Sequence, residues 1–265
     1  YKYFAEESNN SKVRKAFSKY VSPAVVEELL KNEKNLELGG AKKHLTVLFS
    51  DLRGFTTFSE KLDPKQLGDF LNMYLTRMTA EIYKTSGTVD KFIGDAIMAF
   101  YGAPVPNEKQ AQLACRCALQ SVKSLAQLNV ELKGRGFPHL EMGMGINTGD
   151  MSVGNMGSSQ IQNYTVMGDS VNLASRLEGL TRMYGNFIIL GPLTYEAVKG
   201  EFTCREIDQV VVKGKTTAIR IYDLLYEGPP KTEHQEWLQV YRAARDKYVE
   251  GNFEEAQNLF EHCEK

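Results

Sequence analysis

The sequence predicts an α+β fold with a ferredoxin-like βαββαβ core, and two observations lead to that prediction. The first is the order of elements between residues 44 and 147, where the hydrophobic pattern reads as strand, helix, strand, strand, helix and strand. The second is a hairpin signal at Gly94-Asp95, which joins the two middle strands directly. This order places two helices on one face of an antiparallel sheet.

The individual core elements follow from local patterns. Residues 44–51 form a short apolar run that ends in a polar residue, as expected of a buried strand. Asp63-Pro64 suits the start of a helix, and apolar residues keep helical spacing from there to Gly87. The other core elements are expected as strands at 88–93, 96–100 and 140–147 and as a helix at 107–132.

More elements extend this core toward the C-terminus. Gly228-Pro229-Pro230 marks their end, so we expect one domain over residues 41–228. The additional elements are expected as strands at 151–155, 187–190, 202–213 and 219–225 and as a helix at 169–184.

Two flanking segments differ from this domain in composition. Residues 1–40 are largely polar and predict a helical connector. Residues 229–265 predict a helical hairpin that turns at Gly251-Asn252 and resembles one tetratricopeptide-type unit. A single unit of that kind does not bury its own apolar face, so it either packs on the domain or begins a longer array. An ordinary pair of terminal helices explains the pattern equally well.

Composition excludes several classes of protein. The 265 residues are 42% apolar and 25% charged, and 32 basic against 33 acidic residues give a net charge of −1. This balance points to neither nucleic acid nor an anionic membrane surface as a partner. The four cysteines lack disulfide or metal-ligand spacing, so we expect free thiols in a reducing cytoplasm. No run reaches the roughly 18 apolar residues of a spanning helix. The chain starts with Tyr1 and no signal pattern follows, which suggests a piece of a longer protein.

Two aspartates stand where predicted strands end or turn. Asp51 follows the first strand, and Asp95 lies in the predicted hairpin turn. Because these strands are neighbours in the expected sheet, the two carboxylates can face one another. Carboxylates so close repel unless cations lie between them, and hard oxygen ligands favour Mg²⁺ or Mn²⁺. Each aspartate alone is explained as well by a turn-capping role.

A second candidate site lies on the helix at 169–184. Asn172 and Arg176 are four residues apart and share one helix face. An amide and a guanidinium that project together suit a phosphate or ribose ligand. The same spacing also occurs on many solvated helix faces, so the pair alone decides nothing.

Together these segments resemble the class III nucleotidyl cyclases. The resemblance covers roughly residues 44–225, with every motif in the family's order. Its motifs are VLFSDLRGFT (47–56), DKFIGDAIMAFYG (90–102), GINTGD (145–150), YTVMGDSVNLASRLE (164–178) and VVVKGK (210–215).

The resemblance implies a role for each matching position in binding metal and phosphate. Asp51 and Asp95 match the metal-binding pair for two Mg²⁺ or Mn²⁺ ions, with the backbone carbonyl of Leu52 as a further ligand. The backbone of Gly54, Phe55 and Thr56 is expected to approach the phosphates. Lys213, rather than Lys215, matches the lysine that contacts the terminal phosphates.

The resemblance also implies which residues read the nucleoside and support the transition state. Lys91 matches the base-reading lysine and Thr165 its partner; their donor and acceptor groups suit adenine, so the substrate is expected to be ATP. Asn172 is similar to the residue that orients the ribose, and Arg176 to the one that stabilises the transition state. Many animal adenylyl cyclases carry Asp at position 165; Thr is typical of a subgroup widespread in bacteria, some members of which respond to bicarbonate.

The family assembles its sites between two catalytic domains, which here implies a homodimer with shared sites. It also implies an upstream sensor and membrane segments, with the catalytic domain in the cytoplasm. His44 and His139 need no catalytic role. A guanylyl cyclase and a catalytically silent nucleotide-binding domain remain as alternatives, whereas a polymerase or diguanylate cyclase palm lacks the motif at 164–178.

Overall fold

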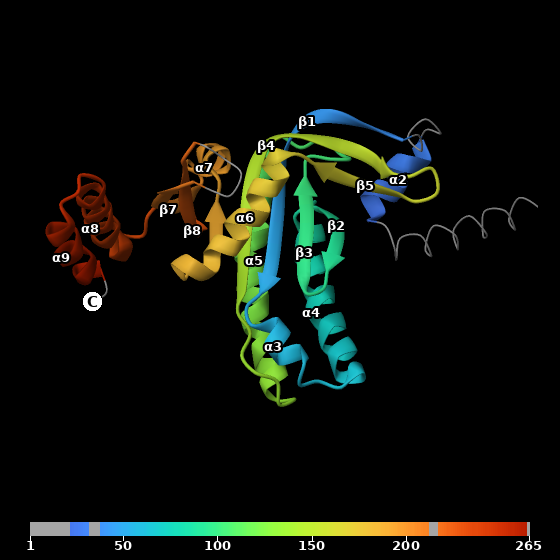
Figure 1. The fold of residues 1–265 in the computed structure, drawn as a ribbon, viewed down its shortest axis with the longest axis horizontal. Helices are drawn as coiled ribbons and strands as arrows, with labels where there is room; N and C mark the ends of the chain where they lie inside the picture. Colours follow the sequence, from blue (N-terminus) through green and yellow to red (C-terminus); the bar gives the residue numbers. More distant parts are fainter. Residues whose placement is uncertain (1–21, 32–37, 212–216, 264–265) are drawn as a thin grey trace, which may run out of the picture.

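A computed structural model describes residues 22–31, 38–211 and 217–263 (Figure 1). Most strands join one mixed sheet in the order β2-β3-β1-β4-β6-β8-β7, and β5 pairs with β4 away from this path. The predicted α+β fold is confirmed.

The first half of the sheet has the ferredoxin-like topology that the sequence predicted. Neighbouring strands in the run β2-β3-β1-β4 are antiparallel. The elements of this half, in chain order, are β1 (Gly39–Leu52), α3 (Phe55–Ser59), α4 (Pro64–Lys84), β2 (Thr88–Ile93), β3 (Ala96–Tyr101), α5 (Gln110–Lys133) and β4 (Met142–Gly157).

The start of α4 is the one that the Asp63-Pro64 pattern predicted. Asp63 Oδ1 accepts hydrogen bonds from the backbone N–H groups of Lys65 and Gln66, both at 2.9 Å. The Gln66 side chain accepts from the backbone N–H of Asp63 in return. This reciprocal arrangement satisfies backbone donors that have no partner inside the helix, which fixes where α4 begins.

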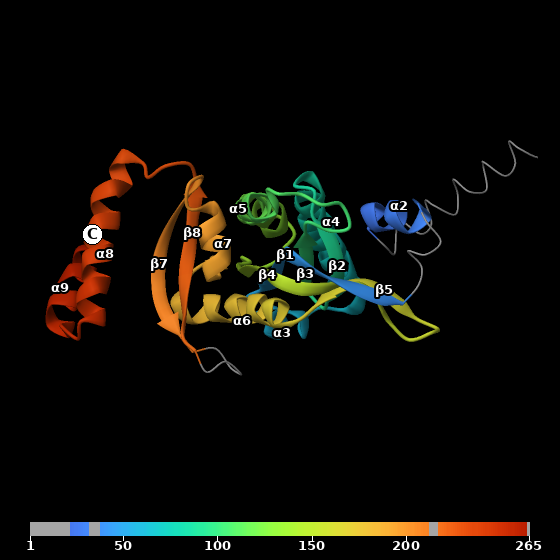
Figure 2. The same cartoon turned by 90° about the horizontal axis from the view of Figure 1, so that it is seen from above.

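The two faces of the sheet carry different packing layers. Helices α4 and α5 lie on one face, and α6 (Asp169–Tyr184) lies on the other (Figure 2). Successive residues of β4 alternate between the two layers. Met142, Met144 and Ile146 belong to the core under α4 and α5. Gly143 and Gly145 face α6, and a Cβ on Gly145 would lie 2.2 Å from the backbone carbonyl oxygen of Ala174. The helix therefore approaches the strand more closely than a side chain would permit.

The long central strands differ from the prediction. β4 is one strand of 16 residues rather than two strands at 140–147 and 151–155, and β1 begins at Gly39 rather than at residue 44. The two strands pair without a break from Gly39↔Asn155 to Leu52↔Met142. The outer half of β1 is exposed and polar, so no apolar run marks it in the sequence.

Three elements were not predicted at all. They are the short helix α3, β5 (Gln162–Met167), which extends the sheet beyond β4, and the short helix α7 (Pro192–Val198). The predicted closing strands are confirmed with different bounds, as β6 (Ile188–Leu190), β7 (Phe202–Val210) and β8 (Ile219–Glu227), the last of which ends later than predicted.

The C-terminal hairpin consists of α8 (Thr232–Val249) and α9 (Phe253–Cys263) and packs on β7. The Arg205 guanidinium carbon lies 5.1 Å from the ring centroid of Trp237 and 4.7 Å from that of Tyr241. Of the two expectations for this segment, docking on the domain is the one seen.

Only part of the N-terminal connector falls within the described residues, as α2 (Pro23–Lys31). No helix among the described residues is both long and apolar enough to cross a membrane. All four cysteines have free thiols, as expected.

Candidate active site

Asp51 and Asp95 lie together at one end of the sheet. Asp51 is near the end of β1, and Asp95 is in the turn between β2 and β3. Because β3 pairs with β1, with Ser50 opposite Ile97, this turn reaches the end of β1. The Leu52 backbone N–H donates to Asp95 Oδ2 at 3.1 Å. The structure thus brings these three predicted metal-site residues into one group.

A third carboxylate from α6 joins this group, which we call the metal corner (Asp51, Asp95 and Glu178). Burial, together with a hydrogen bond and charge repulsion from Asp51, raises the pKa of Asp95 to about 7. Burial and the charges of Asp51 and Asp95 likewise raise the pKa of Glu178 to about 7. Burial is the larger cause of both shifts and the neighbouring carboxylates add to it, so added positive charge is favourable here.

The metal corner fits divalent cations that also bind a substrate. Among the described residues, no three His, Cys, Asp or Glu side chains form a complete metal-binding group. Mg²⁺ in nucleotide enzymes commonly takes one or two carboxylates from the protein and completes its shell with phosphate oxygens and water. Asp51, Asp95 and the Leu52 carbonyl are a donor set of this kind.

Two arginines also reach the metal corner, and the sequence analysis named neither. Arg182 Nη2 on α6 donates to Asp51 Oδ2 at 2.7 Å. Arg53, next to Leu52, donates to the carbonyl of Asn186 at 2.6 Å and pairs with the Glu141 carboxylate at 2.9 Å. Arg53 therefore ties the segment after Asp51 to the end of α6. The i, i+4 spacing of Glu178 and Arg182 was the signal available in the sequence.

The predicted base-reading residues form a second group, which we call the base corner (Asp90, Lys91 and Thr165). Lys91 Nζ donates to Thr165 Oγ1 at 3.5 Å. Thr165 Oγ1 in turn donates to Asp90 Oδ2 at 2.5 Å, and Asp90 Oδ1 lies 3.1 Å from Lys91 Nζ. The structure brings the predicted pair together, and Asp90 is a member that sequence reasoning missed.

Asn172 and Arg176 project from α6 in a direction different from that of Glu178 and Arg182. At 100° per residue, the two pairs are centred about 120° apart around the helix axis. Asn172 is exposed and Arg176 is partly exposed. Within the described residues, neither side chain makes a hydrogen bond or ion pair, whereas Arg182 on the same helix contacts Asp51. The structure therefore does not bring Arg176 to the metal corner of its own chain.

The short helix α3 follows directly after Leu52 and Arg53. Gly54 precedes it with φ 70°, a left-handed conformation that favours glycine. The Phe55 ring packs against Phe58 and Phe70, with centroids at 6.4 and 6.0 Å. This packing fixes the backbone from Gly54 to Thr56 beside the metal corner. Lys213 and Lys215 lie outside the described residues.

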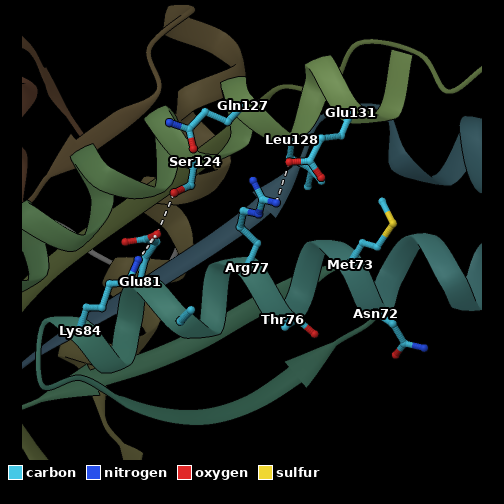
Figure 3. Close-up of a pocket in the computed structure, with 11 residues that line it drawn as sticks. Asn72, Met73, Thr76, Arg77, Glu81, Lys84, Ser124, Gln127, Leu128 and Glu131 are labelled. Carbon is cyan, nitrogen blue, oxygen red and sulfur yellow. Dashed lines mark hydrogen bonds and ion pairs between the residues drawn. The ribbon is translucent and has the colours of Figure 1, made fainter. Parts of the chain in front are cut away.

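A cavity of about 680 Å³ lies elsewhere, between α4 and α5 (Figure 3). Its charged side chains are paired with one another: Arg77 with Glu131 at 2.8 Å, and Glu81 with Lys84 at 3.0 Å. None of the candidate site residues lines it. We therefore place the active site at the two corners and not in this cavity.

Comparison with known protein families shows which family this chain belongs to. The model of the adenylate and guanylate cyclase catalytic domain matches residues 40–225. The chain belongs to the class III nucleotidyl cyclases. The resemblance identified from the sequence motifs is thereby confirmed.

Individual relatives of this cyclase chain include both adenylyl and guanylyl enzymes. An adenylate cyclase specific to terminal differentiation in Dictyostelium discoideum is 35% identical over 93% of this chain and 11% of its own length. An adenylate cyclase of Anabaena cylindrica is 37% identical over 72% of this chain and 38% of its own. The chain thus spans well under half the length of these relatives.

Solved structures support the same fold. The adenylyl cyclase CyaB from P. aeruginosa is 39% identical, with a TM-score of 0.67, over 71% of this chain and 96% of its own. The guanylyl cyclase Cya2 is 36% identical, with a TM-score of 0.68, over 74% of this chain and 98% of its own. Overall similarity in sequence and fold therefore does not distinguish an adenylyl from a guanylyl cyclase.

Proposed function

We propose that this catalytic domain is an adenylyl cyclase that converts ATP to 3′,5′-cyclic AMP and pyrophosphate. The observation that carries the choice of substrate is the base corner. Lys91 offers only donors, which suit the acceptor N1 of adenine, and the Thr165 hydroxyl accepts from the N6 amino group. Guanine presents N1–H and O6 instead, so a donor would face a donor. Three relatives that are 35%, 33% and 37% identical to this chain are named adenylate cyclases.

Asp51, Asp95 and the Leu52 carbonyl are the groups that would hold two Mg²⁺ or Mn²⁺ ions. Such ions, when bound, neutralise triphosphate charge and favour ionisation of the ribose 3′-hydroxyl. The raised pKa of Asp95 and Glu178 supports this assignment, because burial and then the neighbouring carboxylates disfavour their negative charge, which bound cations would offset. The backbone of Gly54, Phe55 and Thr56 lies beside this corner and would approach the phosphates, with Lys213 at their terminal end.

Arg176 would stabilise the negative charge that develops on the α-phosphoryl and bridging oxygens. Its guanidinium has no competing partner within the described residues, which supports a role toward a ligand. Asn172, one helical turn earlier, would hold the ribose so that the 3′-oxygen lies in line with the α-phosphorus.

The active site would be shared between two chains of a homodimer. Asp51 and Asp95 of one protomer would face Lys91, Thr165, Asn172 and Arg176 of its partner. The orientation of α6 supports this, because Arg176 points away from the Asp51 side of its own helix. A two-fold dimer then has two equivalent sites.

We further propose that the domain is the output of a longer signalling receptor. The proposal rests on the cyclase family and on light-regulated adenylyl cyclases among similar solved structures. Upstream sensor and membrane segments, and a cytoplasmic location of the catalytic domain, belong to the same proposal.

Product analysis tests the function directly. Purified protein is incubated with ATP or GTP and Mn²⁺, and the cyclic nucleotides are separated by chromatography. We expect cyclic AMP from ATP and much less cyclic GMP from GTP. Equal efficiency with GTP would favour a guanylyl cyclase, and binding of nucleotide without any product would favour a silent domain.

A further inference from the structure

A buried carboxylate lies directly behind the base-reading pair. The side chain of Asp90 is only 1% exposed, and its two oxygens are directed at Thr165 Oγ1 and Lys91 Nζ. A carboxylate buried to this degree is costly unless it is both paired and hydrogen-bonded. We propose that Asp90 is a positioning residue that sets the base preference of the site. The inference rests on the proposed function, because it concerns the base that the cyclase reads.

The first part of the argument is the polarity of the Thr165 hydroxyl. A threonine hydroxyl has one proton and also accepts, so alone it does not distinguish a base edge that donates from one that accepts. An ionised carboxylate only accepts, so the Thr165 proton is directed to Asp90 Oδ2 at 2.5 Å. The Thr165 oxygen then offers only lone pairs. Adenine N6 donates whereas guanine O6 accepts, so this fixed acceptor fits adenine and opposes guanine.

The second part is the ammonium group of Lys91. Its side chain is 42% exposed, whereas Asp90 and Thr165 are buried, so Lys91 is the member of the base corner that the base meets first. The Asp90 carboxylate lies 3.1 Å from the ammonium and balances its charge. One N–H group of Lys91 is directed to Thr165, which leaves another for adenine N1. Asp90 thereby keeps the Thr165 oxygen as an acceptor and the Lys91 ammonium as a donor toward the base, which is the combination that adenine requires.

A purely structural role for Asp90 leads to a different expectation. Asp90 Oδ2 also accepts from the backbone N–H of Val166 at 3.4 Å, so it connects β2 to β5. Loss of that connection alone would lower catalysis with every nucleotide by the same factor. The ratio of ATP to GTP efficiency therefore separates the two roles.

The test is Asp90→Asn, measured by kcat/KM for ATP and for GTP. The substituted amide is able to donate to Thr165, which releases the hydroxyl proton for guanine O6. We expect GTP efficiency to rise, ATP efficiency to fall, and their ratio to shift by at least about tenfold. Asp69→Asn is the matched control, since Asp69 is exposed on α4 and makes no charged or hydrogen-bonded contact within the described residues. An unchanged ratio, or an equal loss with both nucleotides, would overturn the proposal.

Two further variants keep the test decisive. In a Thr165→Val background, Asp90→Asn should no longer raise GTP use, because the hydroxyl through which Asp90 acts is gone. If Asp90→Asn fails to fold, Asp90→Ser removes the charge with a smaller side chain and should shift the ratio of GTP to ATP efficiency in the same direction. An inactive wild-type protein would refute the proposed function, whereas an ATP-selective wild type with unaltered selectivity in these variants would refute only the role of Asp90.

Discussion

The base corner contains a buried carboxylate and the metal corner contains partly buried ones, and their negative charge is compensated differently. At the base corner, Asp90 is balanced by Lys91 and hydrogen-bonded by Thr165 of the same chain. At the metal corner, Asp95 and Glu178 face other carboxylates, and burial with this repulsion raises the pKa of each to about 7. Asp51 there pairs with Arg182 at 2.7 Å.

This contrast relates each corner to the ligand it is proposed to take. A neutral base is read by hydrogen bonds, so its corner benefits from partners that are fixed before it arrives. The metal ions bring positive charge with them, which relieves the repulsion among the carboxylates of their corner and offsets the negative charge of the triphosphate. The predictions below break or sharpen this difference, beginning with the largest effect.

Removing one charge from the metal corner should have the largest effect. Asp95→Asn retains the size of the side chain and an oxygen that can accept from the Leu52 N–H, but it removes a proposed metal ligand. We expect cyclase activity to fall by about 10²-fold or more, with the fold retained, because electrostatic stabilisation of the transition state is lost. Circular dichroism checks the fold, and Asp69→Asn again provides the control. Wild-type activity of Asp95→Asn at saturating Mn²⁺ would contradict the metal assignment.

Neutralising the base corner should have a smaller effect. Lys91→Gln removes the ammonium and leaves Asp90 buried without its counter-charge. We expect kcat/KM for ATP to fall by roughly 10-fold to 100-fold, the range for losing a hydrogen bond to a charged group. Steady-state kinetics should show that the KM for ATP rises. If Lys91→Gln keeps the nucleotide selectivity and the KM of the wild type, then Lys91 does not read the base.

Relieving the repulsion between carboxylates in the metal-free protein should have the smallest effect. The informative result is whether stability rises or falls. The pKa of Glu178 is raised from 4.5 to about 7, so the folded state binds its proton more tightly than the unfolded state does. Its stabilising contribution is therefore full below about pH 4.5 and is lost as the pH rises through 7.

Glu178→Gln should consequently raise the melting temperature above that of the wild type at pH 8, with less difference at pH 5. Because solvent screens this partly exposed group, we expect about 1 kcal/mol at most, or roughly 2–4 °C. Glu131→Gln, which breaks only the surface pair with Arg77, is the control. A lower melting temperature for Glu178→Gln at pH 8 would show that the metal corner is not under electrostatic strain.

Local sequence patterns predicted the core well because each signal depended only on residues close together in the sequence. Asp63, Pro64 and Gln66 together specify a helix start, and the hairpin at Gly94-Asp95 required no distant partner. The pattern failed for β4 between residues 147 and 151, where Gly149 looks like a break in a strand. Gly149 is instead a position at which α6 approaches the strand, since a Cβ there would lie 2.5 Å from Ser170 Oγ. That packing depends on a helix more than twenty residues away, so the strand itself does not reveal it.

The site was predicted to the extent that motifs marked it. Asp51 and Asp95 could be paired from strand order, and Lys91 with Thr165 from the family resemblance. Asp90, Glu178, Arg53 and Arg182 were missed because their contacts form only after folding. Asp90 meets Thr165 across 75 positions and Arg182 meets Asp51 across 131. Arg53, Asp90 and Glu178 lie inside the recognised motifs, but the motifs alone do not show which distant side chains they contact.

The central claim is that the metal corner and Arg176 of one chain serve different active sites, and mixing two inactive variants tests it most directly. Asp51→Ala lacks a metal ligand, and Arg176→Ala lacks the transition-state guanidinium, so each homodimer should be nearly inactive. In a mixed dimer both lesions fall in one site, and the other site is wild type. Random exchange makes half the dimers mixed with one of two sites intact, so activity should recover to about one quarter of the wild-type value.

Mixing Asp51→Ala with Asp95→Asn is the matched control, because both lesions then lie on the metal side and every site stays defective. That mixture should remain inactive. The recovered activity of the first mixture should fall on dilution, as dimers dissociate. Recovery to about one quarter in the first mixture alone is the predicted result. No recovery, with chain exchange verified by a fluorescence label, would show that each site lies within a single chain and contradict the account.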